Sequence, residues 1–74
     1  MNHIERMEVE LKELKEKIEK AKDFMEKELE EAKFTSEMQR LHLHEQLVHM
    51  WCYAGALEKR IKYDKDKIKG GTND

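Results

Sequence analysis

Apolar residues recur along the first half of the chain with the spacing of an amphipathic helix. They are spaced 3-4-3-4-3-4 and comprise Ile4, Met7, Leu11, Leu14, Ile18, Ala21 and Met25. This is the a/d pattern of a coiled-coil seam, sustained over three heptads. Leu29 and Ala32 continue it with slight drift, and almost all intervening residues are Glu, Lys or Arg. The pattern predicts one long helix over residues 3–32.

A second apolar set follows after a short break. It is spaced 4-3-4-3-4 and comprises Leu43, Leu47, Met50, Ala54, Leu57 and Ile61. Just before it, Ser36 and Gln39 have the spacing of a capping box, which marks a helix start. We therefore predict a second helix over residues 37–68. Because the connection is short, the two helices should be antiparallel.

Two glycines near the C-terminus indicate where the second helix ends. Gly70 and Gly71 are typical of a helix terminus, so we predict one helical hairpin over residues 1–69 and a flexible tail over 70–74. A chain of 74 residues with one Cys forms no internal disulfide. Hairpins this small rarely stay folded without a staple, a metal or oligomerisation. We expect an all-α fold: an antiparallel two-helix hairpin that assembles into a homo-oligomeric helical bundle, a dimer or tetramer.

The charge and composition of the chain limit the classes of partner that it is expected to bind. Charged residues make up 43% of the chain and the net charge is -2, whereas proteins that bind nucleic-acid polymers or anionic membranes usually carry a basic excess. No apolar run approaches the roughly 20 residues that span a membrane. The first ten residues lack the pattern of a signal peptide, and the lone Cys agrees with a reducing compartment. We expect an intracellular protein with neither a nucleic-acid nor a membrane partner.

The segment LHLHEQLVHMWCYAG, residues 41–55, holds three of the four His residues, the only Trp and the only Cys. At about 100° per residue, one flank of the predicted helix carries His42, Gln46, His49, Tyr53 and Arg60. Of these, Gln46, Tyr53 and Arg60 are seven residues apart and fall on one line beside the seam. A tyrosine ring and an arginine guanidinium on one line suit a planar anionic ligand. The alternative is an ordinary bundle edge on which Arg60 pairs with a Glu of the first helix.

The other flank carries His44, Val48, Trp51 and Gly55. A Trp beside a small residue indicates close contact with another helix, and the partner is most simply another protomer. Stacking of Trp51 on a ligand is the alternative interpretation.

A metal site is poorly supported by the same geometry. His44 and His49 are roughly 140° apart on the helix and cannot bind one ion together. His42, Glu45, His49 and Cys52 share a face and are of types that suit zinc, but ligands spread over several turns do not converge on one ion. No phosphate-binding loop or Ser–His–Asp arrangement is present either. We expect no metal, no cofactor and no enzymatic activity.

Several positions resemble a family of small bacteriophage proteins. The second helix of that family reads EQL..M..Y...L..RI, and its first reads IERM..EL.EL..KI. The matching positions here are Lys33-Phe34, Glu45-Gln46-Leu47, Met50, Tyr53, Leu57 and Arg60-Ile61, with Ile4 to Ile18 in the first helix. The resemblance covers residues 3–62 and is most specific in the second helix. That family is similar to the helical viral sponge proteins that oppose the CBASS and Thoeris defences.

The resemblance implies a phage-encoded anti-defence sponge in the cytoplasm of the infected bacterium. Such a protein forms oligomers and binds a cyclic nucleotide immune signal between protomers without degrading it. The predicted ligand-binding residues are Gln46, His49, Tyr53, Arg60, His42 and Trp51. The chain departs from the family pattern at His42, His44, His49 and Trp51. The alternative function is a coiled-coil protein-interaction module or inhibitor of a host protein, which the Glu/Lys face and Trp51 indicate.

Overall fold

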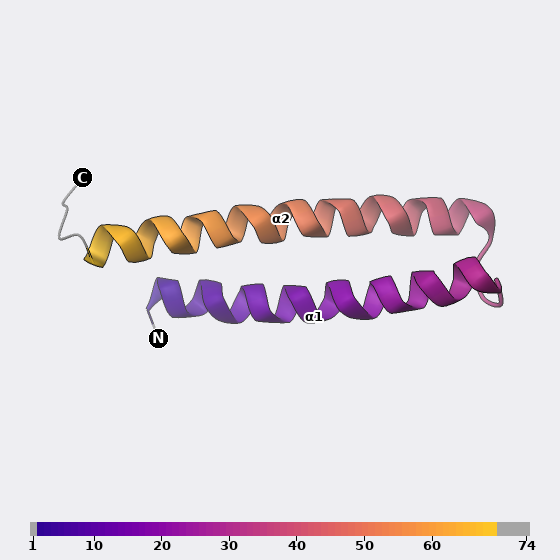
Figure 1. Cartoon of the computed structure of the whole chain (residues 1–74), viewed down its shortest axis with the longest axis horizontal. Coiled ribbons are helices and arrows are strands. Elements are labelled where there is room, and N and C mark those ends of the chain that lie inside the picture. The colour runs from indigo at the N-terminus through magenta and orange to yellow at the C-terminus, as the bar shows by residue number, and fades with distance from the viewer. Residues whose placement is uncertain (1, 70–74) are drawn as a thin grey trace.

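The computed structural model describes residues 2–69, so the predicted tail at 70–74 lies outside the described residues. Two helices, α1 (His3–Glu30) and α2 (Glu37–Lys69), make up this part of the chain, which contains no strand. They lie side by side in opposite directions, and the start of α1 and the end of α2 are at the same end of the molecule (Figure 1). The predicted all-α antiparallel hairpin is therefore confirmed. It is an elongated body of 54 × 19 × 15 Å.

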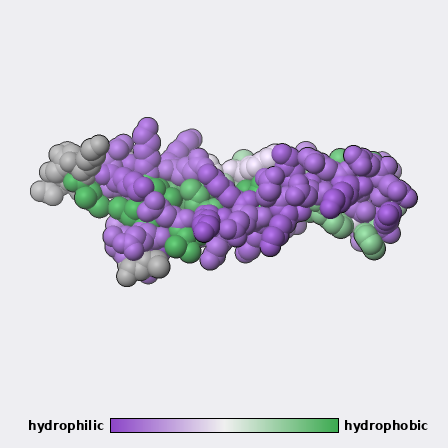
Figure 2. Space-filling model, turned by 60° about the horizontal axis from the view of Figure 1, so that its bottom comes forward, coloured by the Kyte–Doolittle hydropathy of each residue, from purple (hydrophilic) through white to green (hydrophobic). Residues whose placement is uncertain are grey.

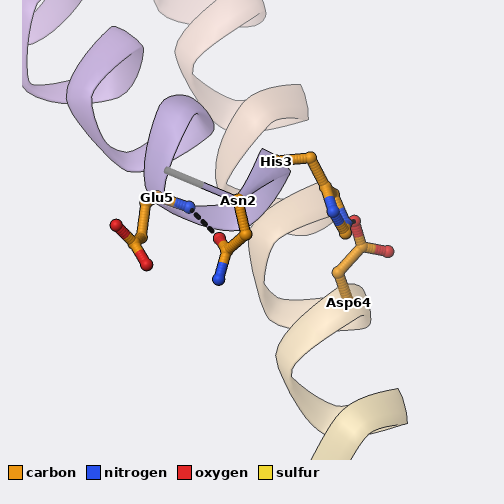
Figure 3. A network of polar contacts seen from close by, with 4 residues as sticks. All are labelled: Asn2, His3, Glu5 and Asp64. Carbon is orange, nitrogen blue, oxygen red and sulfur yellow. Dashed lines mark hydrogen bonds and ion pairs between the residues drawn. The ribbon is translucent and has the colours of Figure 1, made fainter.

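The start of α1 is fixed by a cap and by a contact with α2. The Asn2 side chain accepts a hydrogen bond of 2.8 Å from the backbone N–H of Glu5, which satisfies one of the free donors at a helix start. His3 lies against α2, with its Nε2 3.0 Å from the Asp64 carboxylate (Figure 3). The first turn of α1 is thus held locally by Asn2 and across the hairpin by Asp64.

The core is the seam between the two helices. Its buried residues are Ile4, Met7, Leu14, Ile18, Leu47, Ala54, Leu57 and Ile61, and Leu11, Ala21, Met25 and Met50 pack against them. All belong to the two predicted apolar stripes. Leu47 and Leu57 are 1% and 0% exposed, so they are the centre of the packing. The heptad spacing correctly indicates the core, because it places about one residue per turn on the side of each helix that faces the other helix.

Helix α1 ends at Glu30, two residues before the end expected at about residue 32. Leu29 is 65% exposed and Ala32 lies beyond the end of α1, so neither extends the core. The reason is Glu28, a buried side chain at 4% exposure. Its carboxylate accepts backbone hydrogen bonds from Lys33, Phe34 and Thr35 at 2.9–3.1 Å and one of 2.8 Å from the Thr35 hydroxyl. The chain folds back around this side chain, which stops the helix at Glu30.

The charge state of Glu28 follows from these bonds. Burial of the carboxyl raises its pKa, but the four hydrogen bonds favour the ionised form and lower the pKa to about 2. Glu28 is therefore an anion at physiological pH, and its ionised carboxylate accepts the hydrogen bonds from the turn.

The predicted capping box at the start of α2 is confirmed. The backbone N–H of Ser36 donates to the Gln39 side chain at 2.7 Å, and the backbone N–H of Gln39 donates to the Ser36 hydroxyl at 3.2 Å. Arg40 adds a third contact, since its Nη1 donates to the Thr35 carbonyl oxygen at 2.7 Å. The turn is thus held from α1 by Glu28 and from α2 by this cap.

The outer surface is mainly charged. Ion pairs between the helices include Lys15–Glu58 at 2.8 Å and Glu8–Lys65 at 3.0 Å. Exposed pairs of this kind typically contribute less than about 1 kcal/mol. Figure 2 shows hydrophilic side chains over most of one view, with an apolar strip between them in the half nearest the chain ends. Among residues 2–69, eleven large apolar side chains are exposed: Val9, Phe24, Leu29, Phe34, Met38, Leu41, Val48, Trp51, Tyr53, Tyr63 and Ile68. The hairpin by itself therefore leaves apolar area of these side chains in water.

Candidate functional site

Tyr53 joins α2 to α1 beside the seam. It follows the exposed Cys52 and precedes the buried Ala54, so it stands at the border between core and surface. Its hydroxyl donates a hydrogen bond to the carboxylate of Glu10 in α1. The side chain remains 45% exposed. The aromatic ring is therefore oriented by its hydroxyl and still presents surface to solvent.

The surroundings of Tyr53 set its ionisation. The hydrogen bond to Glu10 raises the pKa of the phenol above its ordinary 10.0, and burial and the negative charge of Glu10 act in the same direction. The positive charge of Arg60 acts in the opposite direction, which places the guanidinium within electrostatic reach of the hydroxyl. The phenol stays a neutral donor at physiological pH, and the face combines a ring, a carboxylate and a guanidinium.

The other residues of the predicted line lie on the same side of α2. His42, Gln46, His49 and Arg60 are all exposed. Because α2 is one continuous helix from Glu37 to Lys69, a spacing of three, four or seven residues keeps these side chains near one side of it. We call this side, with Glu10 of α1, the Tyr53 face. It is an open surface in the single hairpin, so a ligand held on one chain would be covered from one side.

Trp51 lies elsewhere. It is two residues from Tyr53 and so projects from nearly the opposite side of α2; it is 52% exposed. It lines a hollow of about 490 Å³ together with Lys15, Ile18, Glu19, Ala54, Gly55 and Glu58. Within one chain, the structure does not bring Trp51 together with the other predicted ligand-binding residues. We call this side the Trp51 face.

A second hollow, at the turn, was missed from the sequence. It has a volume of about 620 Å³ and is lined by Met25, Leu29, Ser36, Glu37, Met38, Arg40, Leu41 and His44. Met38 and Leu41 are 59% and 50% exposed. The available signal was that these two apolar residues lie outside the heptad spacing of the second stripe. Its volume is in the range of small-molecule sites, and its Arg40 is oriented by the bonds to Thr35.

Two further findings concern the described residues. Among residues 2–69, no three or more His, Cys, Asp or Glu side chains lie close enough together to hold a metal ion. In the same part of the chain, neither helix has a stretch that is both long and apolar enough to cross a membrane.

The Sequestin family model matches residues 1–63. The chain belongs to the Sequestin family. The match spans α1, the turn and α2 as far as Tyr63, and so includes Glu10, Tyr53 and Arg60. The family name suggests a protein that binds and sequesters a partner, and it specifies no ligand. Searches of curated proteins and of solved structures gave no significant match.

Proposed function

We propose that this Sequestin-family chain is a bacteriophage sponge. It binds a cyclic nucleotide immune signal in the cytoplasm of the infected bacterium and holds it without degrading it. Membership of the Sequestin family supports sequestration as the kind of activity. The resemblance in the second helix supports the class of ligand. The observation that carries the proposal is the exposed ring of Tyr53, oriented by Glu10 and within electrostatic reach of Arg60.

Each side chain of the Tyr53 face has a role that suits a cyclic nucleotide. The Tyr53 ring is a stacking surface for a base, and such stacking tolerates different bases. The Arg60 guanidinium suits a phosphate, to which it can donate two parallel hydrogen bonds. The Gln46 amide supplies both a donor and an acceptor for a base edge. His42 and His49 lengthen the polar row on the same side of α2.

Two copies of this face are needed to enclose the ligand. The face is open in one hairpin, and the ring of Tyr53 covers only one side of a base. Two chains related by a two-fold axis would present two copies of Tyr53 and Arg60 to one ligand. That arrangement suits a cyclic dinucleotide with its own approximate two-fold symmetry. A sponge of this kind requires affinity for the ligand itself and no stabilisation of a transition state.

The test is isothermal titration against a panel of cyclic dinucleotides, cyclic trinucleotides and cyclic ADP-ribose isomers. We expect at least one ligand to bind with a Kd below about 10 μM, which corresponds to roughly -7 kcal/mol. Tyr53→Ala and Arg60→Gln should each weaken it at least about tenfold, because they remove a stacking surface and a charged phosphate contact. Lys59→Gln is the matched control, since Lys59 is an exposed neighbour on another side of α2. Mass spectrometry of the recovered ligand should show it intact.

Three outcomes would contradict the proposal. If no ligand of the panel binds below about 10 μM, and a host protein is captured from bacterial lysate by wild type but not by Trp51→Ala, the chain is an interaction module. If a nucleotide binds but depends on Arg40 and not on Arg60 or Tyr53, the site is the hollow at the turn. Loss of intact ligand over time would show an enzyme in place of a sponge.

A further inference from the structure

Two exposed aromatic rings line one hollow at the turn. Phe24 of α1 is 40% exposed, and Phe34 of the turn is 78% exposed. The hollow has a volume of about 450 Å³ and lies at the end of the molecule opposite the chain ends (Figure 1). Neither ring belongs to the core or to the Tyr53 face. The packing of the hairpin therefore gives no reason for two aromatic side chains on this surface.

The turn holds the backbone of Phe34 in a fixed position. Its N–H donates to the Glu28 carboxylate at 2.9 Å. The N–H groups of Lys33 and Thr35, on either side, donate to the same carboxylate at 3.1 and 2.9 Å. Three consecutive bonds to one buried anion restrict this backbone, so a partner that covers the ring loses little conformational entropy. An aromatic residue on a rigid support is the kind of anchor that contributes most to a protein interface.

The charges that line the hollow favour a cation over an anion. Lys27 and Lys33 are opposed by Glu28, Glu30 and Glu31, so acidic residues are in excess in the lining. Helix α1 ends at Glu30, and the C-terminal end of a helix carries a partial negative charge. A phosphate in the hollow would approach both the carboxylates and this end of the helix. The surroundings of the two rings therefore disfavour a nucleotide.

The acidic character extends over the whole turn region. Residues 22–40 contain six acidic and four basic residues, and this excess equals the net charge of -2 of the entire chain. The remainder of the chain is thus balanced. Opposite charges across an interface steer two partners together and select against a partner of like charge. A partner of this end of the hairpin should therefore be basic.

An arginine side chain suits both the rings and the carboxylates of the hollow. Its guanidinium stacks on an aromatic ring and is attracted by the negative face of that ring. Its planar fork also donates paired hydrogen bonds to a carboxylate such as that of Glu30 or Glu31. Lysine has a point charge and lacks this planar geometry, so the hollow should prefer arginine.

We propose that the hollow lined by Phe24 and Phe34 is a docking site for a basic protein segment, which inserts an arginine side chain beside the two rings. Phe34 is the principal anchor, since it is the more exposed ring and its backbone is fixed by Glu28. The site is separate from the Tyr53 face, because Phe24 and Glu10 are 14 residues apart in α1, about 21 Å along the helix. The proposal does not depend on nucleotide binding.

The test is fluorescence anisotropy of a labelled, blocked peptide of alternating arginine and glycine, titrated with the full chain. We expect saturable binding that weakens as salt is added, because the attraction is partly electrostatic. A peptide with citrulline in place of arginine has nearly the same shape without the charge, and it should bind at least about tenfold more weakly. The corresponding lysine peptide should bind with an intermediate affinity, since it keeps the charge without the planar fork.

Variants of the chain test the two rings and the carboxylates. Phe34→Ala and Phe34→Leu should each weaken the arginine peptide at least about threefold, because both remove the ring and leucine keeps an apolar side chain. Ile68→Ala is the matched control, since it removes an apolar side chain that is 66% exposed at the other end of α2. The double change Glu30→Gln and Glu31→Gln should also weaken the peptide, whereas Glu26→Gln, an exposed position outside the lining, should not. Circular dichroism should show every variant as helical.

Four outcomes would overturn the proposal. The first is equal affinity for the arginine and citrulline peptides, and the second is an unchanged affinity of both Phe34 variants. The third is displacement of the peptide by adenosine monophosphate in a way that requires Lys27 and Lys33, which would show a nucleotide site. The fourth is a change of the sedimenting mass of the chain alone in Phe34→Ala, which would show that a second copy covers the hollow.

The proposed function is tested separately with the same variants. Phe34→Ala should bind the panel of cyclic nucleotides as wild type does, because the Tyr53 face is unchanged. Tyr53→Ala should in turn bind the arginine peptide as wild type does. Failure of one proposal therefore leaves the result of the other readable, and a Phe34→Ala chain that loses both ligands would overturn the separation of the two sites.

Discussion

The Tyr53 hydroxyl donates a hydrogen bond to the Glu10 carboxylate, so the candidate site of α2 is tied directly to α1. The two residues are 43 positions apart in the chain and meet only because the helices are antiparallel. The bond fixes the orientation of a half-exposed ring that would otherwise rotate on the surface. The packing of the hairpin and the shape of the Tyr53 face are therefore coupled.

The first prediction concerns the ionisation of Tyr53. In a Tyr63→Phe background, tyrosinate absorbance should show a pKa above 10.0, and Glu10→Gln should lower this pKa, because the negative charge is lost and a neutral amide oxygen replaces the carboxylate acceptor. Because the pKa of Tyr53 is higher in the folded state than in the unfolded state, the neutral phenol stabilises the fold below pH 10. This stabilisation is lost as the pH rises through the folded-state pKa. Wild type should thus lose stability above pH 10 more steeply than Tyr53→Phe. Glu13→Gln, an exposed change elsewhere on α1, should leave the titration unchanged; an equal effect of both variants would contradict the assignment.

The second prediction concerns Glu28. Its pKa of about 2, against 4.5 for an ordinary Glu, means that the ionised carboxylate stabilises the turn above pH 4.5. This stabilisation should be lost as the pH falls through about 2. Glu28→Gln should therefore lower the melting temperature at neutral pH, and its difference from wild type should shrink on acidification. Glu26→Gln and Glu30→Gln, at exposed positions nearby, are the controls. A Glu28→Gln chain as stable as these controls at neutral pH would refute the role of the buried carboxylate.

The third prediction concerns the cap of α2. Ser36→Ala removes the hydroxyl that accepts from Gln39 and should cost about 1 kcal/mol in urea unfolding. Ser36→Gly should cost only a few tenths of a kcal/mol, because glycine is itself tolerated at a helix start. Equal stability of Ser36→Ala and wild type would mean that the turn is held by Glu28 alone.

The fourth prediction separates the core from the surface. Leu57→Ala removes a side chain that is fully buried and should cost about 2–5 kcal/mol. Leu29→Ala makes the same chemical change at a side chain 65% exposed and should stay within about 0.5 kcal/mol of wild type. Denaturant unfolding followed by circular dichroism measures both. Similar costs at the two positions would show that Leu29 is buried in the protein's assembled state.

Local patterns explain why much of the fold was predictable. A heptad stripe indicates which side of a helix is apolar, and the residues of the observed core all belong to the two predicted stripes. The capping box of Ser36 and Gln39 spans one helical turn, so it too is a local signal. The alignment of Gln46, Tyr53 and Arg60 on one side of α2 follows from helix geometry alone. Whether that side binds a ligand is not encoded in spacing.

The missed features depend on contacts between distant or irregular parts of the chain. Glu28 lies in a run of glutamates and looks like its neighbours in sequence, yet only it is enclosed by the turn. Glu10 is one of many acidic residues of α1, and the register of the hairpin selects it as the partner of Tyr53. Ile68 continues the seam seven residues after Ile61 but is 66% exposed, because α2 extends past the start of α1 (Figure 1).

By itself, the sequence determined two amphipathic helices, their apolar sides and the cap between them, because these follow from the periodicity of one helix and from contacts within a turn. Only the tertiary structure decided where α1 ends and which carboxylate of α1 accepts the hydrogen bond from Tyr53. Those outcomes depend on the register and closure of two helices against each other. Register is set by side chains far apart in sequence, so no local pattern records it.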